Sequence, residues 1–117
     1  MPNTPYIIYH NPRCRKSRET LELLMHQCTK VEIIDYLKTP PDEKELKTIL
    51  KKLGMKANDL IRKKEPIYLE KYKDKELSEE EWIKVMVKNP ILIERPIVVH
   101  GDKAIIGRPP ETVNQLI

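Results

Sequence analysis

The segment from Tyr6 to Cys14 constrains the fold most, because it places a cysteine between a predicted strand and a predicted helix. Tyr6–Tyr9 is a short run of β-branched and aromatic residues, which is typical of a buried strand. Asn11-Pro12 indicates a turn. An amphipathic helix is predicted after it, from apolar residues that recur at i, i+3, i+4 and i+7: Leu21, Leu24, Met25 and Cys28. Cys14 is therefore expected at a helix N-terminus.

Cys14 has the surroundings of a reactive thiol. At a helix N-terminus, unpaired backbone N–H groups and the positive end of the helix dipole stabilise a thiolate, which lowers the pKa of the thiol. His10 lies four residues before Cys14, and four cationic residues surround it: Arg13, Arg15, Lys16 and Arg18. The alternative is a packing role, since free cysteine is among the most buried residue types, but this much charge argues against an apolar pocket. We interpret Cys14 as a nucleophile and His10 as a residue that orients or polarises its loop.

Composition and motif content argue against several classes of function. The two cysteines, Cys14 and Cys28, have no partner at zinc-ligand spacing, so we expect no metal. We also expect no bound cofactor. No nucleic-acid motif is present, and the aromatic residues are five Tyr and one Trp, so no nucleic-acid partner is expected. No apolar run approaches about 18 residues and no signal-like N-terminus is seen, so we expect a cytoplasmic protein with no membrane partner. The net charge of +4 favours anionic ligands.

The sequence between the first helix and the C-terminal region predicts a second strand and a helical middle. Val31–Ile34 is the second strand. The first helix of the middle ends at Gly54, a residue type that favours the left-handed conformation after a helix, and it carries one apolar stripe: Leu46, Ile49, Leu50 and Leu53. A short helix over Ala57–Arg62 is followed by a breaker at Pro66.

The C-terminal part predicts a capped helix, a hairpin and a last helix. A capping box at Ser78–Glu81 predicts the start of a helix that buries three apolar residues: Trp82, Val85 and Met86. A β-hairpin is predicted around Gly101-Asp102, from two β-branched runs: Ile97–Val99 and Ala104–Ile106. Pro109-Pro110 begins a last helix that carries two apolar residues: Val113 and Leu116.

These elements follow the order of a known architecture. A βαβ unit comes first, then a helical segment, then a ββα unit, and the cysteine directly follows the first strand. This is the plan of the thioredoxin fold. We therefore predict an α/β chain with a single thioredoxin-like domain over residues 1–117, and a helical insertion between the two units at roughly residues 42–90.

Several separate motifs in the same order resemble those of one family. They are YHNPRC at the first turn, DYLKTPP after the second strand, IRKKEP in the helical middle, ILIERPIVV at the third strand and GRPPE before the last helix. Through them the chain closely resembles the glutaredoxin-coupled arsenate reductases over nearly its whole length. The resemblance implies reduction of arsenate or a similar oxyanion, with glutathione as co-substrate and glutaredoxin as partner.

The resemblance also implies roles for particular residues. It implies that Cys14 attacks arsenate with His10 beside it, and that three arginines hold the oxyanion: Arg62, Arg95 and Arg108. Guanidinium groups suit this role because they stay charged and pair bidentately with tetrahedral oxyanions. Supporting roles fall on Asn11, Ser17 and Pro96. A proline opens the third strand of the resembled fold beside the cysteine, so we expect a cis Arg95-Pro96 peptide bond.

Two other functions remain open at this stage. Relatives of the resembled family include a redox-sensing regulator that binds RNA polymerase and glutathione-dependent thiol reductases of unknown substrate. Ser17 stands where thioredoxins carry a second cysteine, so the loop around Cys14 cannot close its own disulfide there. A thiol from outside must then resolve the intermediate. The lack of a Cys-x-x-Cys switch favours an enzyme over a sensor. The apolar stripe that includes Cys28 indicates a packing thiol rather than a partner of Cys14.

Overall fold

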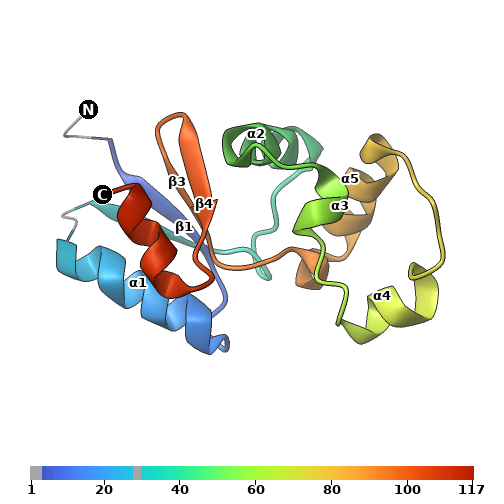
Figure 1. The fold of residues 1–117 in the computed structure, drawn as a ribbon, viewed down its shortest axis with the longest axis horizontal. Helices are drawn as coiled ribbons and strands as arrows, with labels where there is room; N and C mark the ends of the chain where they lie inside the picture. The colour runs from blue at the N-terminus through green and yellow to red at the C-terminus, as the bar shows by residue number, and fades with distance from the viewer. Residues whose placement is uncertain (1–3, 28–29) are drawn as a thin grey trace. The chain divides into compact units, whose positions relative to one another are not determined.

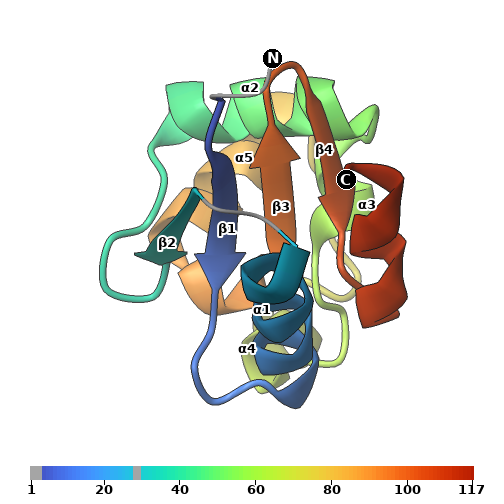
Figure 2. The ribbon, with the colours of Figure 1, turned by 90° about the vertical axis from the view of Figure 1, so that its left-hand side faces the viewer.

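Four strands form one mixed sheet in which β1 lies between β2 and β3. The computed structural model describes residues 4–27 and 30–117 (Figure 1). The strand order is β2-β1-β3-β4, as Figure 2 shows, with β1 parallel to β2 and antiparallel to β3. β4 is antiparallel to β3. The bounds of the strands are β1 Tyr6–His10, β2 Val31–Asp35, β3 Ile97–His100 and β4 Lys103–Ile106.

Two helical elements pack against this sheet and enclose its core. α1 (Arg15–Gln27) connects the parallel strands β1 and β2, and η2 (Pro110–Gln115) follows β4 and lies beside α1 (Figures 1 and 2). The core between them is made of fully buried side chains: Ile8, Leu24, Val98 and Val113. Burial of such aliphatic side chains contributes roughly 1.5–3 kcal/mol each to the stability of this layer. The sheet, α1 and η2 therefore form a stable platform for the loop after β1.

The chain divides into two compact units, of which the sheet, α1 and η2 make up the first. The first unit is Met1–Thr39 with Arg95–Ile117, and the second is Pro40–Glu94. Helices make up most of the second unit: α2 Glu43–Leu53, α3 Ala57–Leu60, α4 Pro66–Lys71, α5 Glu79–Lys88 and the 3₁₀ helix η1 Pro90–Leu92. α5 packs against α2, α3 and η1. A single domain with an insertion at roughly residues 42–90 stays a prediction.

The predicted helix caps are present in the second unit. Gly54 ends α2 with φ of 69°, the left-handed conformation expected after a helix. Ser78 and Glu81 form both halves of the capping box, because each side chain accepts a hydrogen bond from the backbone N–H of the other residue. α2 has a further N-cap in Asp42, whose side chain accepts from the backbone N–H of Glu45 at 2.7 Å.

The fold agrees with the predicted α/β, thioredoxin-like order, and three helix boundaries differ from the prediction. α3 ends at Leu60 rather than Arg62, because Ile61 forms an antiparallel bridge with Ile93. Pro66 begins α4 instead of breaking a helix, since the first helical turn needs no N–H from that residue. The last helix, η2, begins at Pro110 and is a 3₁₀ helix rather than an α-helix.

The predicted apolar faces need two corrections. Met25 is 60% exposed, and the buried face of α1 consists of Ser17, Thr20 and Leu24 instead. Val85 is only partly buried in α5, where Ile83 joins Trp82 and Met86 in the core. The buried Ser17 and Thr20 have hydrogen-bond partners, which is why a helix face that looks polar in the sequence can lie inside. Cys28, the last residue of the predicted stripe, lies outside the described residues.

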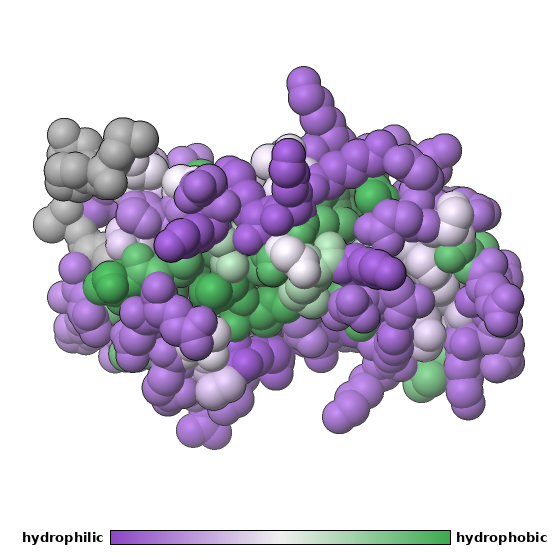
Figure 3. Space-filling model, turned by 45° about the horizontal axis from the view of Figure 1, so that its top comes forward, coloured by the Kyte–Doolittle hydropathy of each residue, from purple (hydrophilic) through white to green (hydrophobic). Residues whose placement is uncertain are grey.

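Hydrophilic side chains dominate the face of the molecule drawn in Figure 3, with apolar residues showing between them. Charged residues make up 34% of the chain. Within residues 4–27 and 30–117, no helix is long and apolar enough to cross a membrane.

Candidate active site

Cys14 lies at the junction of β1 and α1, as predicted. Its backbone N–H donates to the carbonyl of Asn11 at 3.0 Å, and its own carbonyl accepts from the N–H of Arg18 at 3.0 Å. Cys14 is therefore the residue that precedes the first turn of α1, where helix N–H groups are free to meet an anion. The side chain is 8% exposed, and the groups that interact with its sulfur are polar.

Ser17 ties the loop before Cys14 to the first turn of α1. Its hydroxyl oxygen accepts a hydrogen bond from the backbone N–H of Asn11 at 3.0 Å and lies 2.6 Å from Nδ1 of His10. The Asn11 side chain in turn accepts from the backbone N–H of Arg13 at 3.0 Å. Asn11 and Ser17 were predicted as supporting residues, and His10 was predicted as a catalytic one. They hold the backbone on both sides of the turn, and so they set the position of Cys14.

The surroundings of His10 favour its neutral form. It is buried, and burial lowers its pKa below the ordinary value of 6.5; the charge of Asp35 opposes this and that of Arg18 adds to it. A neutral imidazole can accept a hydrogen bond at Nδ1. In the tautomer with its proton on Nε2, Nδ1 of His10 accepts from the hydroxyl of Ser17, whose oxygen accepts from the backbone N–H of Asn11. Through Ser17, His10 is therefore joined to the backbone of the loop that carries Cys14.

The pKa of Cys14 is lowered from its ordinary value of 9.0. Burial acts in the opposite direction and is the largest single effect, but several groups together outweigh it. The backbone N–H of Ser17 donates to the thiolate, the guanidinium of Arg95 hydrogen-bonds it, and the charges of Arg95 and Arg108 stabilise it further. A larger share of Cys14 is thus thiolate at neutral pH than in an ordinary cysteine, and the thiolate is the nucleophilic form.

Arg95 and Arg108 reach Cys14 from the region of β3 and β4. Nη2 of Arg108 donates to Sγ of Cys14 over 3.4 Å, and its Nε donates to the carbonyl of Arg95 at 2.8 Å. Arg95-Pro96 is a cis peptide bond, which confirms the prediction. Arg108-Pro109 is also cis, which sequence reasoning did not predict. The structure thus brings two of the three predicted arginines together at the thiol.

Sequence reasoning missed Gly107 and Thr20, which place Arg108. A Cβ on Gly107 would lie 2.5 Å from Oγ1 of Thr20 and 2.9 Å from Cγ of Pro96, so only glycine fits between them. The backbone N–H of Gly107 donates to the carbonyl of Pro96 at 2.8 Å, and its carbonyl lies 3.2 Å from the Thr20 hydroxyl. A glycine directly before an arginine was the only signal in the sequence.

Arg62, the third predicted arginine, belongs to the second unit. Its Nε lies 3.3 Å from Oε1 of Glu65 and its Nη1 lies 3.5 Å from Oε1 of Glu94. Its backbone N–H donates to the carbonyl of Leu92 at 2.7 Å, which holds the residue at the end of α3. A role for Arg62 at the oxyanion stays a prediction.

The cations next to Cys14 in the sequence contribute less than expected. Arg13, Arg15, Lys16 and Arg18 are all exposed, and none of them is among the groups that lower the pKa of Cys14. Arg15 pairs with Glu19 at 2.9 Å, one helical turn further on. The activating charges instead come from Arg95 and Arg108, far away in the sequence. This corrects the expectation that local charge activates the thiol.

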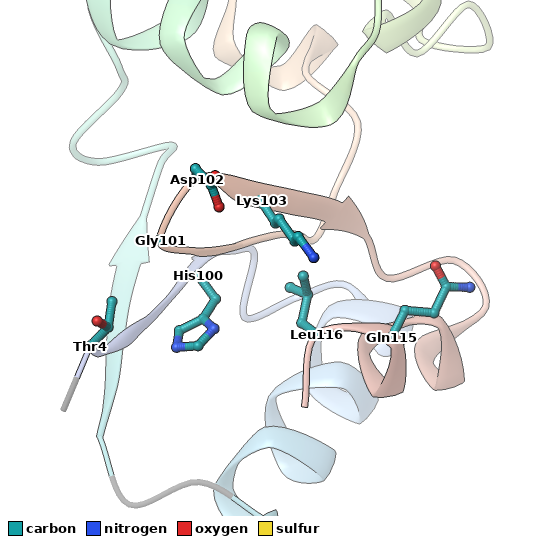
Figure 4. A pocket seen from close by; sticks show the side chains of 7 residues that line it. All are labelled: Thr4, His100, Gly101, Asp102, Lys103, Gln115 and Leu116. Carbon is teal, nitrogen blue, oxygen red and sulfur yellow. The ribbon is translucent and has the colours of Figure 1, made fainter. Parts of the chain in front are cut away.

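Other candidate sites among the described residues are weaker. Residues 4–27 and 30–117 contain no group of three or more His, Cys, Asp or Glu side chains that could hold a metal ion. A cavity of about 640 Å³ lies between the β3–β4 turn and the end of η2 (Figure 4). His100 and Lys103 line it, and His100 stacks on Tyr6 at 3.9 Å. Tyr6 begins β1 and Cys14 follows its end, so this cavity lies at the other end of the strand.

Comparison with known proteins shows which family the chain resembles. The ArsC family model matches residues 9–116. The chain is 54% identical over 112 residues to a protein of Escherichia coli named "Uncharacterized protein YfgD", covering 94% of each. It is 46% identical over 113 residues to an arsenate reductase of Haemophilus influenzae, covering 95% of this chain and 97% of the relative.

A solved structure extends the likeness to three dimensions. An arsenate reductase from Vibrio cholerae superimposes with a TM-score of 0.92 at 43% sequence identity, over 97% of this chain and 98% of the other. The family match begins at Tyr9 and ends at Leu116, so it includes the loop around Cys14 and the segments that carry Arg95 and Arg108. The chain therefore belongs to the ArsC family.

Proposed function

We propose that this protein reduces arsenate to arsenite, with Cys14 as the nucleophile and with glutathione and glutaredoxin as the source of electrons. The observation that carries the proposal is the contact between Nη2 of Arg108 and Sγ of Cys14, at 3.4 Å. It places a permanent positive charge beside a thiol whose pKa is lowered. The arsenate reductases of Haemophilus influenzae and Escherichia coli, at 46% and 38% identity, support the choice of substrate.

Arg95 and Arg108 can reduce the charge repulsion that opposes this reaction. Arsenate is an anion, and it repels a thiolate unless cations neutralise part of its charge. Nε of Arg108 donates to the backbone carbonyl of Arg95 and its Nη2 donates to Sγ of Cys14, so the guanidinium of Arg108 can bind oxyanion oxygens without a large loss of side-chain freedom. The guanidinium of Arg95 hydrogen-bonds the same sulfur. We assign Arg62 to the same oxyanion as a third ligand.

Two thiols supply the two electrons that arsenate needs. The thiolate of Cys14 attacks arsenic(V) and displaces an oxygen that leaves as water, which forms a sulfur–arsenic bond. The thiolate of glutathione then attacks Sγ of Cys14. The sulfur–arsenic electron pair stays on arsenic, which leaves as arsenite, while Cys14 forms a mixed disulfide with glutathione. A thiol of glutaredoxin attacks the glutathione sulfur of this disulfide and regenerates Cys14.

The second thiol comes from outside in this scheme. Ser17 stands three residues after Cys14, is fully buried, and holds His10 and the N–H of Asn11. Its hydroxyl therefore supports the loop at the position where a dithiol enzyme carries its resolving cysteine. Because the reaction consumes reduced glutathione, we place the protein in a reducing compartment, the cytoplasm.

The test is a coupled assay of the purified protein. NADPH consumption is followed with glutathione, glutathione reductase and glutaredoxin, with and without arsenate. We expect arsenate-dependent consumption, one arsenite formed per NADPH, and no turnover in Cys14→Ser. Replacement of glutathione and glutaredoxin by thioredoxin and its reductase should abolish turnover.

Two results would contradict the proposal in different ways. Turnover with thioredoxin alone would leave arsenate as substrate and overturn the reductant. No arsenate dependence, together with glutathione-dependent reduction of a small disulfide, would overturn the substrate and support a thiol reductase.

A further inference from the structure

A second cavity lies directly beside the loop of Cys14. It has a volume of about 350 Å³ and is lined by Asn11, Pro12, Arg13, Asp35, Leu37 and Lys38. This volume falls in the range of roughly 300–1,000 Å³ that is typical of small-molecule sites. All of these residues belong to the first unit.

The order of strands places this cavity on the opposite side of β1 from the arginines. Cys14 follows the end of β1, the strand between β2 and β3. Asp35 is the last residue of β2 and pairs with His10, so the cavity lies on the β2 side. Arg95 precedes β3, which is antiparallel to β1, and Arg108 follows β4. The cationic pair therefore lies on the β3 side of β1, and the cavity lies on its β2 side, next to the loop that leads to Cys14.

The charges that line the cavity form a distinctive set. Arg13 and Lys38 are exposed cations, and Asp35 is a partly buried carboxylate. Oδ1 of Asp35 accepts from the backbone N–H of Leu37 at 3.2 Å, and its carbonyl accepts from the N–H of Lys38 at 3.0 Å. These bonds fold the chain after β2 into a turn and hold Asp35 and Lys38 at the same rim.

We propose that this cavity binds glutathione, with Arg13 and Lys38 on its two carboxylates and Asp35 on its ammonium group. Glutathione carries two negative charges and one positive charge near pH 7, and the cavity offers the complementary two positive charges and one negative charge. Pro12 and Leu37, whose side chain is 38% exposed, give an apolar surface for the peptide between these groups. The choice of glutathione rests on the proposed function.

The position of the cavity suits the chemistry of thiol exchange. The attacking sulfur approaches a sulfur atom in line with the bond that breaks, from the side opposite the leaving group. With the arsenic held at Arg95 and Arg108, this rule directs the glutathione thiolate to the side of Cys14 away from the two arginines, which we assign to the β2 side. Arg13 is adjacent to Cys14 in the chain, and an extended tripeptide spans up to roughly 10 Å, so a glutathione bound at Arg13 can bring its sulfur to Sγ.

The test measures the first step of thiol exchange without arsenate, so its result does not depend on the proposed substrate. Reduced protein reacts with oxidised glutathione: the Cys14 thiolate attacks one sulfur, Cys14 becomes glutathionylated, and one glutathione thiolate leaves. The second-order rate is compared with that for hydroxyethyl disulfide, which is uncharged, and 3,3′-dithiodipropionate, which is anionic but lacks the ammonium group. The ratio of rates cancels any change in the reactivity of Cys14 itself.

We expect Arg13→Ala and Lys38→Ala each to lower the rate with oxidised glutathione by about three- to fivefold relative to hydroxyethyl disulfide, the usual effect of one exposed charge contact. Asp35→Asn should slow oxidised glutathione but not dithiodipropionate. Lys30→Ala is the matched control, because Lys30 is an exposed lysine before β2 just as Lys38 is one after it, and its ratio should equal that of the wild type.

The key quantity is the rate with oxidised glutathione divided by the rate with hydroxyethyl disulfide. If this ratio were the same in Arg13→Ala, Lys38→Ala and Lys30→Ala, the cavity would not be a glutathione site. If every variant, Asp35→Asn included, lost the same fraction of its rate with oxidised glutathione and with dithiodipropionate, the effect would be one of general surface charge. That result would also overturn the cavity as a glutathione site. The rate with oxidised glutathione could fall selectively in the cavity variants while the coupled assay shows no arsenate reduction. This combination would support the cavity as a glutathione site and reject arsenate as the substrate.

Discussion

At the scale of single residues, the activation of Cys14 combines one local group with two distant ones. The backbone N–H of Ser17 is part of the same helical turn, whereas Arg95 and Arg108 come from the other end of the chain. The local part follows from a helix N-terminus and survives any change of side chain. The distant part depends on two guanidinium groups and can therefore be removed one residue at a time.

Removal of Arg108 should raise the pKa of Cys14 towards its ordinary value of 9.0, because the thiolate loses a charge that stabilises it. The alkylation rate of Cys14 is measured against pH in wild type and Arg108→Ala, with the modified peptide identified by mass spectrometry. In the wild type the rate should be half-maximal below pH 9.0, and in the variant at a higher pH than in the wild type.

Arg15→Ala is the control for this measurement. Arg15 is next to Cys14 in the sequence, but its side chain is 84% exposed, it pairs with Glu19, and it is not among the groups that lower the pKa of Cys14. Its profile should match the wild type. A larger shift in Arg15→Ala than in Arg108→Ala would show that local charge activates the thiol after all.

The three arginines should also differ from the surface cations in their effect on catalysis. Arg95→Ala and Arg108→Ala should each lower kcat/KM for arsenate by roughly 10- to 100-fold, the loss of one charge-assisted hydrogen bond to the oxyanion. Arg62→Ala should act in the same direction, and Arg15→Ala should have little effect. Unchanged kinetics in all three alanine variants would leave the oxyanion site without support and favour the thiol-reductase alternative.

The residues of the site differ in how much the sequence revealed of them. Cys14 could be located by local rules, because a strand, an Asn-Pro turn and an apolar stripe fix its place within a few residues. Arg95 and Arg108 could be named only through a family resemblance, since nothing in the spacing of 81 or 94 residues shows contact with Cys14. Thr20 and Gly107 could not be found, because their roles depend on how closely two distant segments approach.

At the scale of elements, the contact between α1 and the segment after β4 positions Arg108. Gly107→Ala should destabilise the fold by about 1–3 kcal/mol, because the added methyl group overlaps Thr20 and Pro96. The displaced backbone moves Arg108 away from Cys14, so we also expect a loss of arsenate turnover beyond the loss of stability. Thermal unfolding and turnover are measured on the same preparation, below the unfolding temperature.

Gly101→Ala separates these two effects. Gly101 has φ of 63°, so alanine there costs about 1–2 kcal/mol, but the space around its Cβ is open. Its turnover should stay near that of the wild type despite a similar loss of stability. If both variants lost turnover in proportion to their stability, Gly107 would have no part in placing Arg108.

The elements show which sequence signals are sufficient on their own. The ends of α2 and α5 were predictable at Gly54 and Ser78–Glu81, because a cap is decided by three or four neighbouring residues. The role of Pro66 as the first residue of α4 was not predictable, because proline can either end a helix or occupy its first turn. The choice between an α-helix and a 3₁₀ helix at Pro110 depends on packing with α1 and β4, which no local pattern reports.

At the scale of the whole molecule, the question is whether the second cysteine of the chain, Cys28, takes part in the reaction. We expect Cys28→Ala to keep arsenate turnover. Arg15–Gln27 is one helix of 13 residues, so a bond between Cys14 and Cys28 would require this helix, about 20 Å long, to open. Cys28 itself lies outside the described residues. Mass spectrometry of the oxidised wild type should find glutathione on Cys14. A Cys14–Cys28 disulfide in active enzyme would instead supply an internal reductant.

The separation of Cys14 from its two arginines also has a consequence during protein synthesis. A ribosome adds roughly 5–20 residues per second, so Arg95 and Arg108 emerge on the order of ten seconds after Cys14. Until then the nascent thiol has neither guanidinium beside it and keeps a pKa closer to that of an ordinary cysteine. We therefore expect the nucleophile to be translated in a less reactive form and to gain its full reactivity when the C-terminal strands fold against β1.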